Sequence, residues 1–351
     1  MKVSIFIPVY NGEKYIGKTL DSILSQSYTN FEILCVDDSS VDNSWDVLLD
    51  YQKKDDRVKI YRKENEGNVP FSWRFILPKI SGEWTLYLSQ DDFLENDSLE
   101  KLCRRQLETG ADAVIPKTIY YYATQKNNHV QLGLNGNISP VINGCQAFML
   151  SLDYSIPGHV LWNMDVIRAN SDIPTDTFDS DDYMQRVWFY HCKKVAFSDA
   201  AYYYRQDNSD AITKKIGYYR FETLRTNLRL LDLVYKYNID SYTIDAFKYY
   251  LFNITLDYLA LYYHHKSEYS LDQRISINQL IYLSYKALRK YEKHTWKRIL
   301  AFNFFIFKVV PRRRCHRRCA DQAGRHPQGW LHHRCARKTG PAHPFCGRGG
   351  K

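Results

Sequence analysis

Alternating strand and helix patterns in the first hundred residues predict an α/β fold built on a mostly parallel, doubly wound sheet. Continuous apolar runs at 3–9, 31–36 and 84–88 have the length and residue types of strands covered on both faces. Between the first two runs, apolar residues recur at helical spacing from 15 to 24. Strands that alternate with helices favour parallel pairing, with helices on both faces of the sheet.

Two of these strands run directly into paired carboxylates, Asp37-Asp38 and Asp91-Asp92. Ligands of open α/β sheets bind beyond the carboxyl ends of the strands. Burying two adjacent carboxylates at this position costs desolvation free energy unless a cation pairs with them. The sequence has neither G-x-G-x-x-G after the first strand nor a P-loop motif. A strand-end site that holds acids and lacks a glycine-rich phosphate-binding loop favours a nucleoside diphosphate bound through a divalent metal ion. A solvated turn that begins the next helix is the simpler alternative.

The net charge of +9 comes from the end of the chain. Residues 311–351 contain nine Arg, two Lys and one Asp, which leaves a net charge of −1 for residues 1–310. The isoelectric point therefore gives no argument for nucleic-acid binding by the body of the protein.

The tail has Cys and His without C-x-x-C spacing. A zinc site, a basic disordered arm and translation in the wrong reading frame are alternative explanations, and we leave the tail out of the fold prediction.

Other features predict a cytoplasmic protein. The four cysteines of residues 1–310 are isolated, as is typical of reduced proteins. No secretory signal pattern begins the chain, and no window has the length and apolar character of a membrane-spanning helix. The best apolar stretch, 299–310, follows several basic residues. It predicts either a buried terminal helix or a helix in a membrane interface.

The second part of the chain continues the alternation less regularly. We expect a helix at 98–109, a strand at 113–115, a polar loop at 125–143 and a return to the sheet edge at 162–167. A further helix opens with Asp181 and Asp182 in its first turn, where acids stabilise the helix dipole or act as a general base. From 216 to 310 the pattern is helical and rich in aromatic residues.

Several segments, taken together in this order, resemble the family 2 glycosyltransferases of the GT-A fold. They are Ile7–Glu13, Leu20–Tyr28, Glu32–Asp42, Asn65–Gly67, Gly82–Trp84 and Ser89–Asp92. The resemblance is dense over 3–100 and looser over 175–213. It implies transfer of a sugar, with inversion, from a nucleoside diphosphate sugar, with a UDP-sugar as first candidate. It also implies a glycan or lipid-linked acceptor and bacterial surface-glycan synthesis at the inner face of the cytoplasmic membrane.

The resemblance also implies roles for individual residues. The nucleotide-sugar donor would be bound by Pro8, Tyr10, Glu13, Asp38, Asp91 and Arg205. Asp92 would bind Mg²⁺ or Mn²⁺, although Ser89 stands where many relatives carry the first Asp of a D-x-D motif. Asp182 would be the catalytic base, with Asp181 as its contender. Arg205 has a second interpretation, as a residue that caps the core through an ion pair with a carboxylate.

This assignment divides the chain into four parts. Residues 1–105 would bind the nucleotide sugar and 106–215 the acceptor, 216–310 would form a helical region, and 311–351 the aberrant tail. Two other functions are compatible with the fold class. A non-catalytic relative would keep the fold and bind a glycan or a protein. A sugar-phosphate nucleotidyltransferase would carry a glycine-rich loop ending in Arg or Lys after the first strand, and Tyr10–Glu13 is not such a loop.

Overall fold

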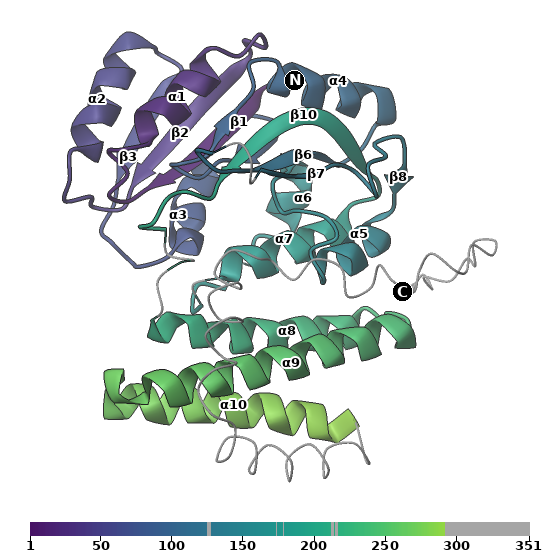
Figure 1. The fold of residues 1–351 in the computed structure, drawn as a ribbon. Coiled ribbons are helices and arrows are strands. Elements are labelled where there is room, and N and C mark those ends of the chain that lie inside the picture. Colours follow the sequence, from purple (N-terminus) through teal and green to yellow (C-terminus); the bar gives the residue numbers. More distant parts are fainter. Residues whose placement is uncertain (125–127, 173, 178, 212–213, 215–216, 292–351) are drawn as a thin grey trace. The chain divides into compact units, whose positions relative to one another are not determined.

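The computed structural model describes residues 1–291 except 125–127, 173, 178, 212–213 and 215–216, with side chains up to Leu288. The chain forms two compact units (Figure 1). The first consists of residues 1–175 and 180–211, and the second of residues 176–179 together with the chain from 212 onward. The halves predicted at 1–105 and 106–215 both contribute strands to one sheet in the first unit.

The sheet of the first unit confirms the predicted α/β class. In the described residues it has ten strands: β1 Val3–Val9, β2 Phe31–Asp37, β3 Val58–Arg62, β4 Trp84–Tyr87, β5 Phe93–Leu94, β6 Ala113–Tyr121, β7 His129–Gln131, β8 Val141–Ile142, β9 Leu161–Asn163 and β10 Val195–Arg205. The strand order is β3-β2-β1-β4-β9-β6-β10-β5, with β7 beside β6 and β8 beside β10. The first four strands are parallel neighbours, so their carboxyl ends meet at one edge.

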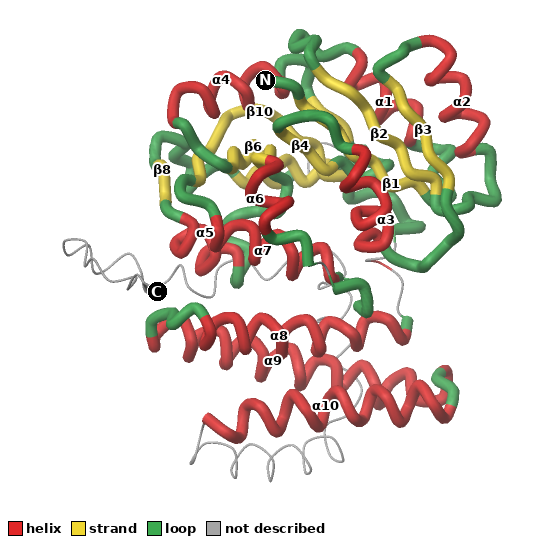
Figure 2. The backbone as a smooth tube through the Cα atoms, turned by 180° about the vertical axis from the view of Figure 1, so that it is seen from behind, coloured by secondary structure: helices red, strands yellow, loops and turns green. Residues whose placement is uncertain are grey.

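Helices cover both faces of this sheet, as the continuous apolar strands require. The helices of the first unit are α1 Ile16–Leu24, α2 Ser44–Lys54, α3 Val69–Ile76 with the 3₁₀ turn η1 Leu77–Lys79, α4 Ser98–Thr109, α5 Gly144–Ser151, α6 Met164–Ala169 and α7 Ser180–His191. Helices α1, α2 and α4 lie on one face and α3, α5, α6 and α7 on the other (Figure 2).

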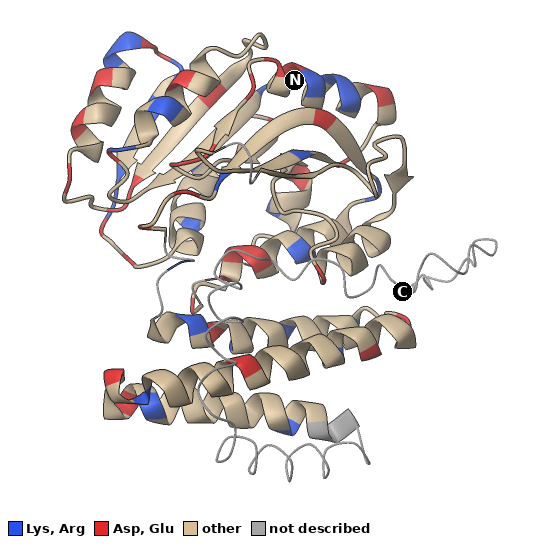
Figure 3. Cartoon of the chain, in the orientation of Figure 1, with Lys and Arg blue, Asp and Glu red and all other residues tan. Residues whose placement is uncertain are grey.

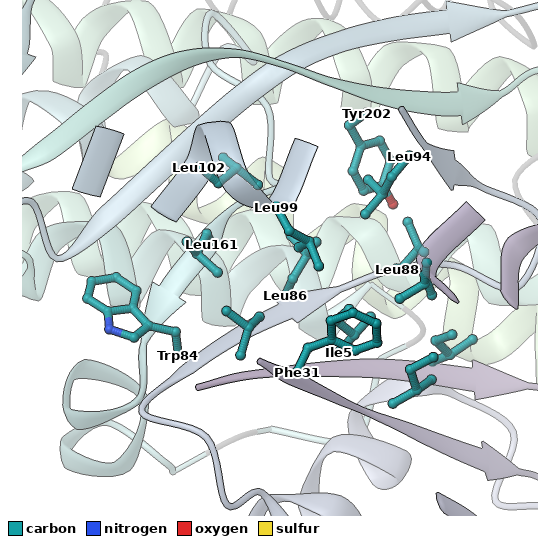
Figure 4. Close-up of a cluster of buried hydrophobic side chains, with 14 of the residues drawn as sticks. Ile5, Phe31, Trp84, Leu86, Leu88, Leu94, Leu99, Leu102, Leu161 and Tyr202 are labelled. Atoms are coloured by element: carbon teal, nitrogen blue, oxygen red, sulfur yellow. The ribbon is translucent and has the colours of Figure 1, made fainter. Parts of the chain in front are cut away.

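Each face has its own hydrophobic core. Between the sheet and α1 and α4, side chains such as Ile5, Leu86, Leu99 and Tyr202 are fully buried (Figure 4). On the opposite face Trp73, Trp162 and Trp188 anchor the second core, where Trp188 packs edge-on against both other indoles with ring centroids 5.5 Å apart. Two cores back to back fix the sheet rigidly, and with it the loops at the ends of the strands.

The second half of the sheet differs from the prediction. We expected residues 162–167 to return to the sheet edge, and this was wrong. Strand β9 lies inside the sheet, antiparallel to both β4 and β6, and residues from Met164 onward form α6. The predicted polar loop at 125–143 contains the short strands β7 and β8. A three-residue strand has too few residues to show a period in the sequence, so only pairing with β6 reveals it.

The second unit is helical, as predicted. Its described elements are the 3₁₀ turn η4 Tyr218–Glu222, the helices α8 Thr223–Lys236, α9 Ser241–His265 and α10 Leu271–Tyr291, and the short turn η5 Lys266–Glu268. Its core includes Phe221, Leu224, Tyr262, Ile277 and Leu280. None of the helices in the described part of the chain is long and apolar enough to cross a membrane. Acidic and basic residues are mixed along α4, whereas in α2 the two acids precede the two lysines at its end (Figure 3).

Candidate active site

The ends of β1, β2 and β4 are joined at one edge of the sheet. The Asp38 N–H donates to the Val9 carbonyl at 2.8 Å, which ties the end of β2 to β1. The Gln90 side chain ties β4 to β1, because it accepts from the Tyr10 N–H at 2.8 Å and donates to the Tyr10 carbonyl at 3.0 Å. This brings Pro8, Tyr10 and Asp38 to the same edge as the Asp91-Asp92 pair. The Tyr10 side chain stays exposed there.

Glu13 lies just beyond this edge and contacts the loop before α2. Its carboxylate accepts from both the backbone and the side-chain amide of Asn43, at 3.0 and 2.9 Å. Asp42 in turn accepts from the Glu13 N–H at 3.1 Å. These hydrogen bonds of Glu13 therefore join two loops, and the residue remains exposed. Its predicted contact with a nucleotide stays a prediction.

Asp37 and Asp38 have different surroundings. Asp37 is fully buried, accepts from the Ser40 N–H and lies 3.1 Å from the Arg62 guanidinium. Asp38 has 11% of its side chain exposed and pairs with the Lys63 ammonium at 2.5 Å. Lys63 also reaches Glu66 at 2.9 Å. Both acids are thus held by a basic partner, and Asp38 is the slightly more exposed of the two.

The Asp91-Asp92 pair divides in the opposite order. Asp92 is completely buried, and its two carboxylate oxygens accept from the Tyr202 hydroxyl at 2.7 Å and from the Arg205 N–H at 2.8 Å. Burial, and then the neighbouring Asp91 carboxylate, raises the pKa of Asp92 well above its usual range. Asp91 is half-buried, and one of its oxygens accepts from the Asn208 side chain at 2.7 Å.

Arg205 lies beside Asp91 at the end of β10. Its Nε donates to the Asp91 carbonyl at 2.8 Å, and its guanidinium pairs with Asp207 at 3.1 Å. The guanidinium carbon also lies 4.8 Å from the centre of the Tyr15 ring. Arg205 therefore holds the backbone of the acidic loop in place. Both sequence interpretations, a core-capping ion pair and a contact to the leaving diphosphate, remain compatible with this position.

The acids of α7 face two different neighbours. Asp182 accepts from the Tyr154 hydroxyl at 2.8 Å and pairs with Arg186 at 2.6 Å. Asp181 lies close enough to Tyr87, the last residue of β4, for its charge to act on it: burial, and then the Asp181 charge, raises the pKa of Tyr87 above its usual range. The first turn of α7 is therefore beside the same sheet edge as the Asp91-Asp92 pair.

These contacts bear on the predicted metal ligand. A carboxylate that binds a metal ion needs an oxygen open to it, and both oxygens of Asp92 are buried and hydrogen-bonded. Asp91 is half-buried, and the Asn208 amide donates to one of its two oxygens. No group of three or more His, Cys, Asp or Glu residues in the described part of the chain is arranged around a common point. Mg²⁺ is commonly bound by one or two carboxylates together with phosphate and water, so Asp91 is the acid of this pair that could take part in such a site.

The sequence analysis did not predict several residues that contact the candidate site. Gln90, Lys63, Tyr202 and Tyr154 each contact a predicted site residue through a pairing that is distant in sequence or depends on loop geometry. The contact of Arg186 with Asp182 could have been predicted from the sequence. Arg186 follows Asp182 by four residues on one helix, the spacing at which opposite charges meet.

The arrangement just described is that of a nucleotide-sugar transferase of the GT-A fold. Residues 4–156 match the family model "Glycosyl transferase family 2". The glycosyltransferase GlyG of Streptococcus pneumoniae serotype 4 is 26% identical over 215 residues, which are 58% of this chain and 70% of GlyG. The poly(ribitol-phosphate) beta-glucosyltransferase of Bacillus spizizenii is 36% identical over 120 residues, 33% of this chain and 19% of that enzyme.

Among solved structures, S. aureus TarS 1–349 in complex with UDP-GlcNAc superposes with a TM-score of 0.59 at 18% identity, covering 79% of each chain. At this identity the likeness is one of fold. The family match covers the N-terminal part of the chain, residues 4–156, and together with the relatives it supports a glycosyltransferase of the family 2 type. It spans a minor part of several longer relatives, so its own substrates are a matter for proposal.

Proposed function

We propose that this protein transfers a sugar, with inversion, from a UDP-sugar to a hydroxyl group of a glycan or lipid-linked acceptor in the synthesis of a bacterial surface polysaccharide. The observation that carries this proposal is the junction of three strand ends, where Gln90 and the Asp38 amide bring Tyr10, Asp38 and Asp91 to one edge. A base-binding acid, an exposed aromatic ring and an available carboxylate for a metal-bound diphosphate meet there.

In this proposal Asp38 accepts an N–H of the uracil ring, and the exposed Tyr10 ring packs against the base. Asp91 replaces Asp92 as the candidate ligand of Mg²⁺ or Mn²⁺, because Asp92 is enclosed by Tyr202 and Arg205. When bound, the metal ion neutralises the charge of the leaving diphosphate. Pro8, Glu13 and Arg205 complete the donor site: Glu13 by joining the two loops, and Arg205 by fixing the Asp91 backbone.

The transfer itself is a single displacement. The acceptor oxygen forms a bond to the anomeric carbon while the bond from that carbon to the diphosphate oxygen breaks, and UDP leaves with the electron pair. The acceptor hydroxyl must lose its proton as it attacks, and an Asp carboxylate within hydrogen-bonding reach can take it. We assign this role to Asp182, with its neighbour Asp181 in the first turn of α7 as the alternative.

The relatives support the class of acceptor. The Bacillus spizizenii relative is named for transfer to poly(ribitol phosphate), a cell-surface polymer, and TarS was crystallised with UDP-GlcNAc. We extend both to this chain as a proposal: a UDP-sugar donor and a surface-polymer acceptor. We also propose a cytoplasmic protein with peripheral membrane contact. The segment at 299–310 that suggested this contact lies outside the described residues.

A donor panel tests the proposal. Binding and turnover of UDP-, GDP-, dTDP- and CMP-sugars are measured by calorimetry and nucleotide release, with Mn²⁺ or with EDTA. We expect metal-dependent binding of a UDP-sugar, and turnover that falls at least about 100-fold in Asp182→Asn while donor binding persists. Asp181→Asn, measured beside it, decides between the two acids. A folded protein that binds none of these donors would refute the proposal and favour the non-catalytic relative.

A further inference from the structure

Tyr154 reaches the proposed base from outside its helix. It lies between α5 and β9, and its hydroxyl donates to Oδ2 of Asp182 at 2.8 Å. Its backbone has a φ of +59°, in the left-handed region that a residue with a side chain adopts only at a cost. A tyrosine held in such a conformation, with its hydroxyl on a carboxylate, indicates that the surrounding structure fixes it there.

Arg186 holds the other oxygen of the same carboxylate. Its guanidinium lies 2.6 Å from Oδ1 of Asp182 and donates to the Asp182 carbonyl at 2.7 Å. The guanidinium carbon is also 4.8 Å from the centre of the Tyr154 ring. Arg186 is buried, with 3% of its surface exposed. With one donor on each oxygen, the Asp182 carboxylate has a single orientation.

Gln131 in turn fixes Tyr154. Its side-chain amide donates to the carbonyls of Tyr154 and Ser155, both at 2.9 Å, and its own oxygen accepts from the Tyr120 hydroxyl at 3.2 Å. Gln131 belongs to β7 and Tyr120 to β6, the strand pair of the predicted acceptor half. A continuous set of hydrogen bonds thus runs from the β6–β7 pair through Tyr154 to Asp182.

Asp182, Tyr154 and Arg186 line one open hollow, together with Ser151, Gly158 and Gln185. A carboxylate offers about four lone-pair positions, and Tyr154 and Arg186 occupy one on each oxygen. The hollow is about the size of one water molecule, so a hydroxyl group can donate to Asp182 from this side without displacing either neighbour.

We propose that Tyr154 is a positioning residue: its hydroxyl, fixed through Gln131, orients the Asp182 carboxylate toward the acceptor hydroxyl. This inference rests on the proposed function, with Asp182 as the base. It adds that the β6–β7 pair belongs to the catalytic apparatus through Tyr154, although it supplies no reacting group.

The test removes one hydroxyl at two places. Tyr154→Phe deletes the hydroxyl that donates to Asp182. Tyr51→Phe is the matched control, because the Tyr51 hydroxyl also donates to an aspartate, Asp21, at 2.6 Å, in a helix pair remote from the hollow. Donor turnover is measured for the parent chain and both variants across pH, together with the donor dissociation constant and urea unfolding.

We expect kcat of Tyr154→Phe to fall about tenfold or more with the donor dissociation constant unchanged, because one hydrogen bond to a charged group is lost. The pH–rate profile of Tyr154→Phe should also differ from that of the parent, because the Asp182 carboxylate loses one of its two hydrogen-bond donors. Gln131→Glu, which exchanges the amide donors for oxygen, should shift kcat in the same direction.

Tyr51→Phe should keep the kcat and the pH profile of the parent. If Tyr154→Phe loses stability but retains both, as the control does, Tyr154 is a structural clamp and the inference is wrong. If the parent chain turns over no donor, or if Asp182→Asn remains fully active, the proposed function or its base has failed instead, and the inference falls with it.

Discussion

The two carboxylate pairs at the sheet edge look alike in the sequence and have opposite arrangements in the structure. In Asp37-Asp38 the first acid is completely buried and the second keeps 11% of its side chain exposed. In Asp91-Asp92 the second acid is buried and the first is half-exposed. Adjacent side chains point to opposite sides of the chain as it leaves a strand, so one acid of each pair must turn inward.

The buried acids stabilise loops, and their partners show how. Asp37 accepts from the Ser40 N–H within its own loop, whereas Asp92 joins the loop to Tyr202 and Arg205 on β10, more than a hundred residues away. Asp38 and Asp91 are the more exposed acids of their pairs, and we propose that these two contact the ligand. A motif of two acids therefore marks a site, but only the neighbours of each acid decide which one binds the ligand.

The sharpest test of this comparison pairs Asp91→Ala with Asp92→Ala. We expect Asp91→Ala to lower metal-dependent donor turnover at least about 100-fold, because it removes the candidate metal ligand. Asp92→Ala should lower the free energy of unfolding by about 2 to 4 kcal/mol, since a buried hydroxyl and a buried N–H lose their acceptor. Urea unfolding and Mn²⁺-dependent donor binding separate the two effects.

For Asp91→Ala the loss of stability should stay near 1 kcal/mol, from the Asn208 amide alone. In the reverse outcome, Asp92→Ala would keep its stability and no longer respond to Mn²⁺, while Asp91→Ala would still respond. That result would restore Asp92 as the metal ligand that the sequence predicted.

The Asp37-Asp38 pair allows the same comparison, with smaller expected changes in binding and stability. Asp38→Asn should weaken UDP binding about tenfold with little change in stability, because Lys63 keeps Glu66 as a partner. Asp37→Asn should lower the free energy of unfolding by about 1 to 2 kcal/mol through the loss of the charge beside Arg62. Calorimetric titration with UDP and urea unfolding measure these quantities. Equal effects of both substitutions on UDP binding would contradict the division of roles.

Glu32, near the opposite end of β2 from Asp37, shows how a buried acid contributes to stability alone. Although burial opposes it, hydrogen bonds from Lys59, Ser4 and Ser81 lower the pKa of Glu32 to about 2. A lowered pKa in the folded state stabilises the protein above the unfolded-state pKa of about 4.3, and this stability is lost as the pH falls toward 2.

We therefore expect about 2 kcal/mol of stability to disappear between roughly pH 4.5 and 2, and this part of the pH dependence to be absent in Glu32→Gln. Urea unfolding at several pH values measures it, and Glu95→Gln, at an exposed position, is the control. If the parent and Glu32→Gln lose stability in parallel over this range, the network around Glu32 contributes nothing to the acid response.

Much of this protein could be predicted from the sequence because the signals are local. Continuous apolar runs predicted β1, β2 and β4, helical spacing predicted α1 and α4, and the acids after two strands indicated the sheet edge as the site. Strands inserted out of order were not predictable in this way. Strand β9 pairs with β4 and β6, whose paired residues lie 75–79 and 47–49 positions earlier in the chain, and nothing in its three residues encodes those partners.

The roles within the site were decided by tertiary structure for the same reason. Residue type and spacing determined that acids stand at the strand ends and in the first turn of α7. Tyr202 and Arg205 buried Asp92, and Tyr154 and Arg186 oriented Asp182. The chemical behaviour of a carboxylate depends on its solvent exposure and on the donors around it, and except for Arg186 these donors come from distant parts of the chain that only folding brings together.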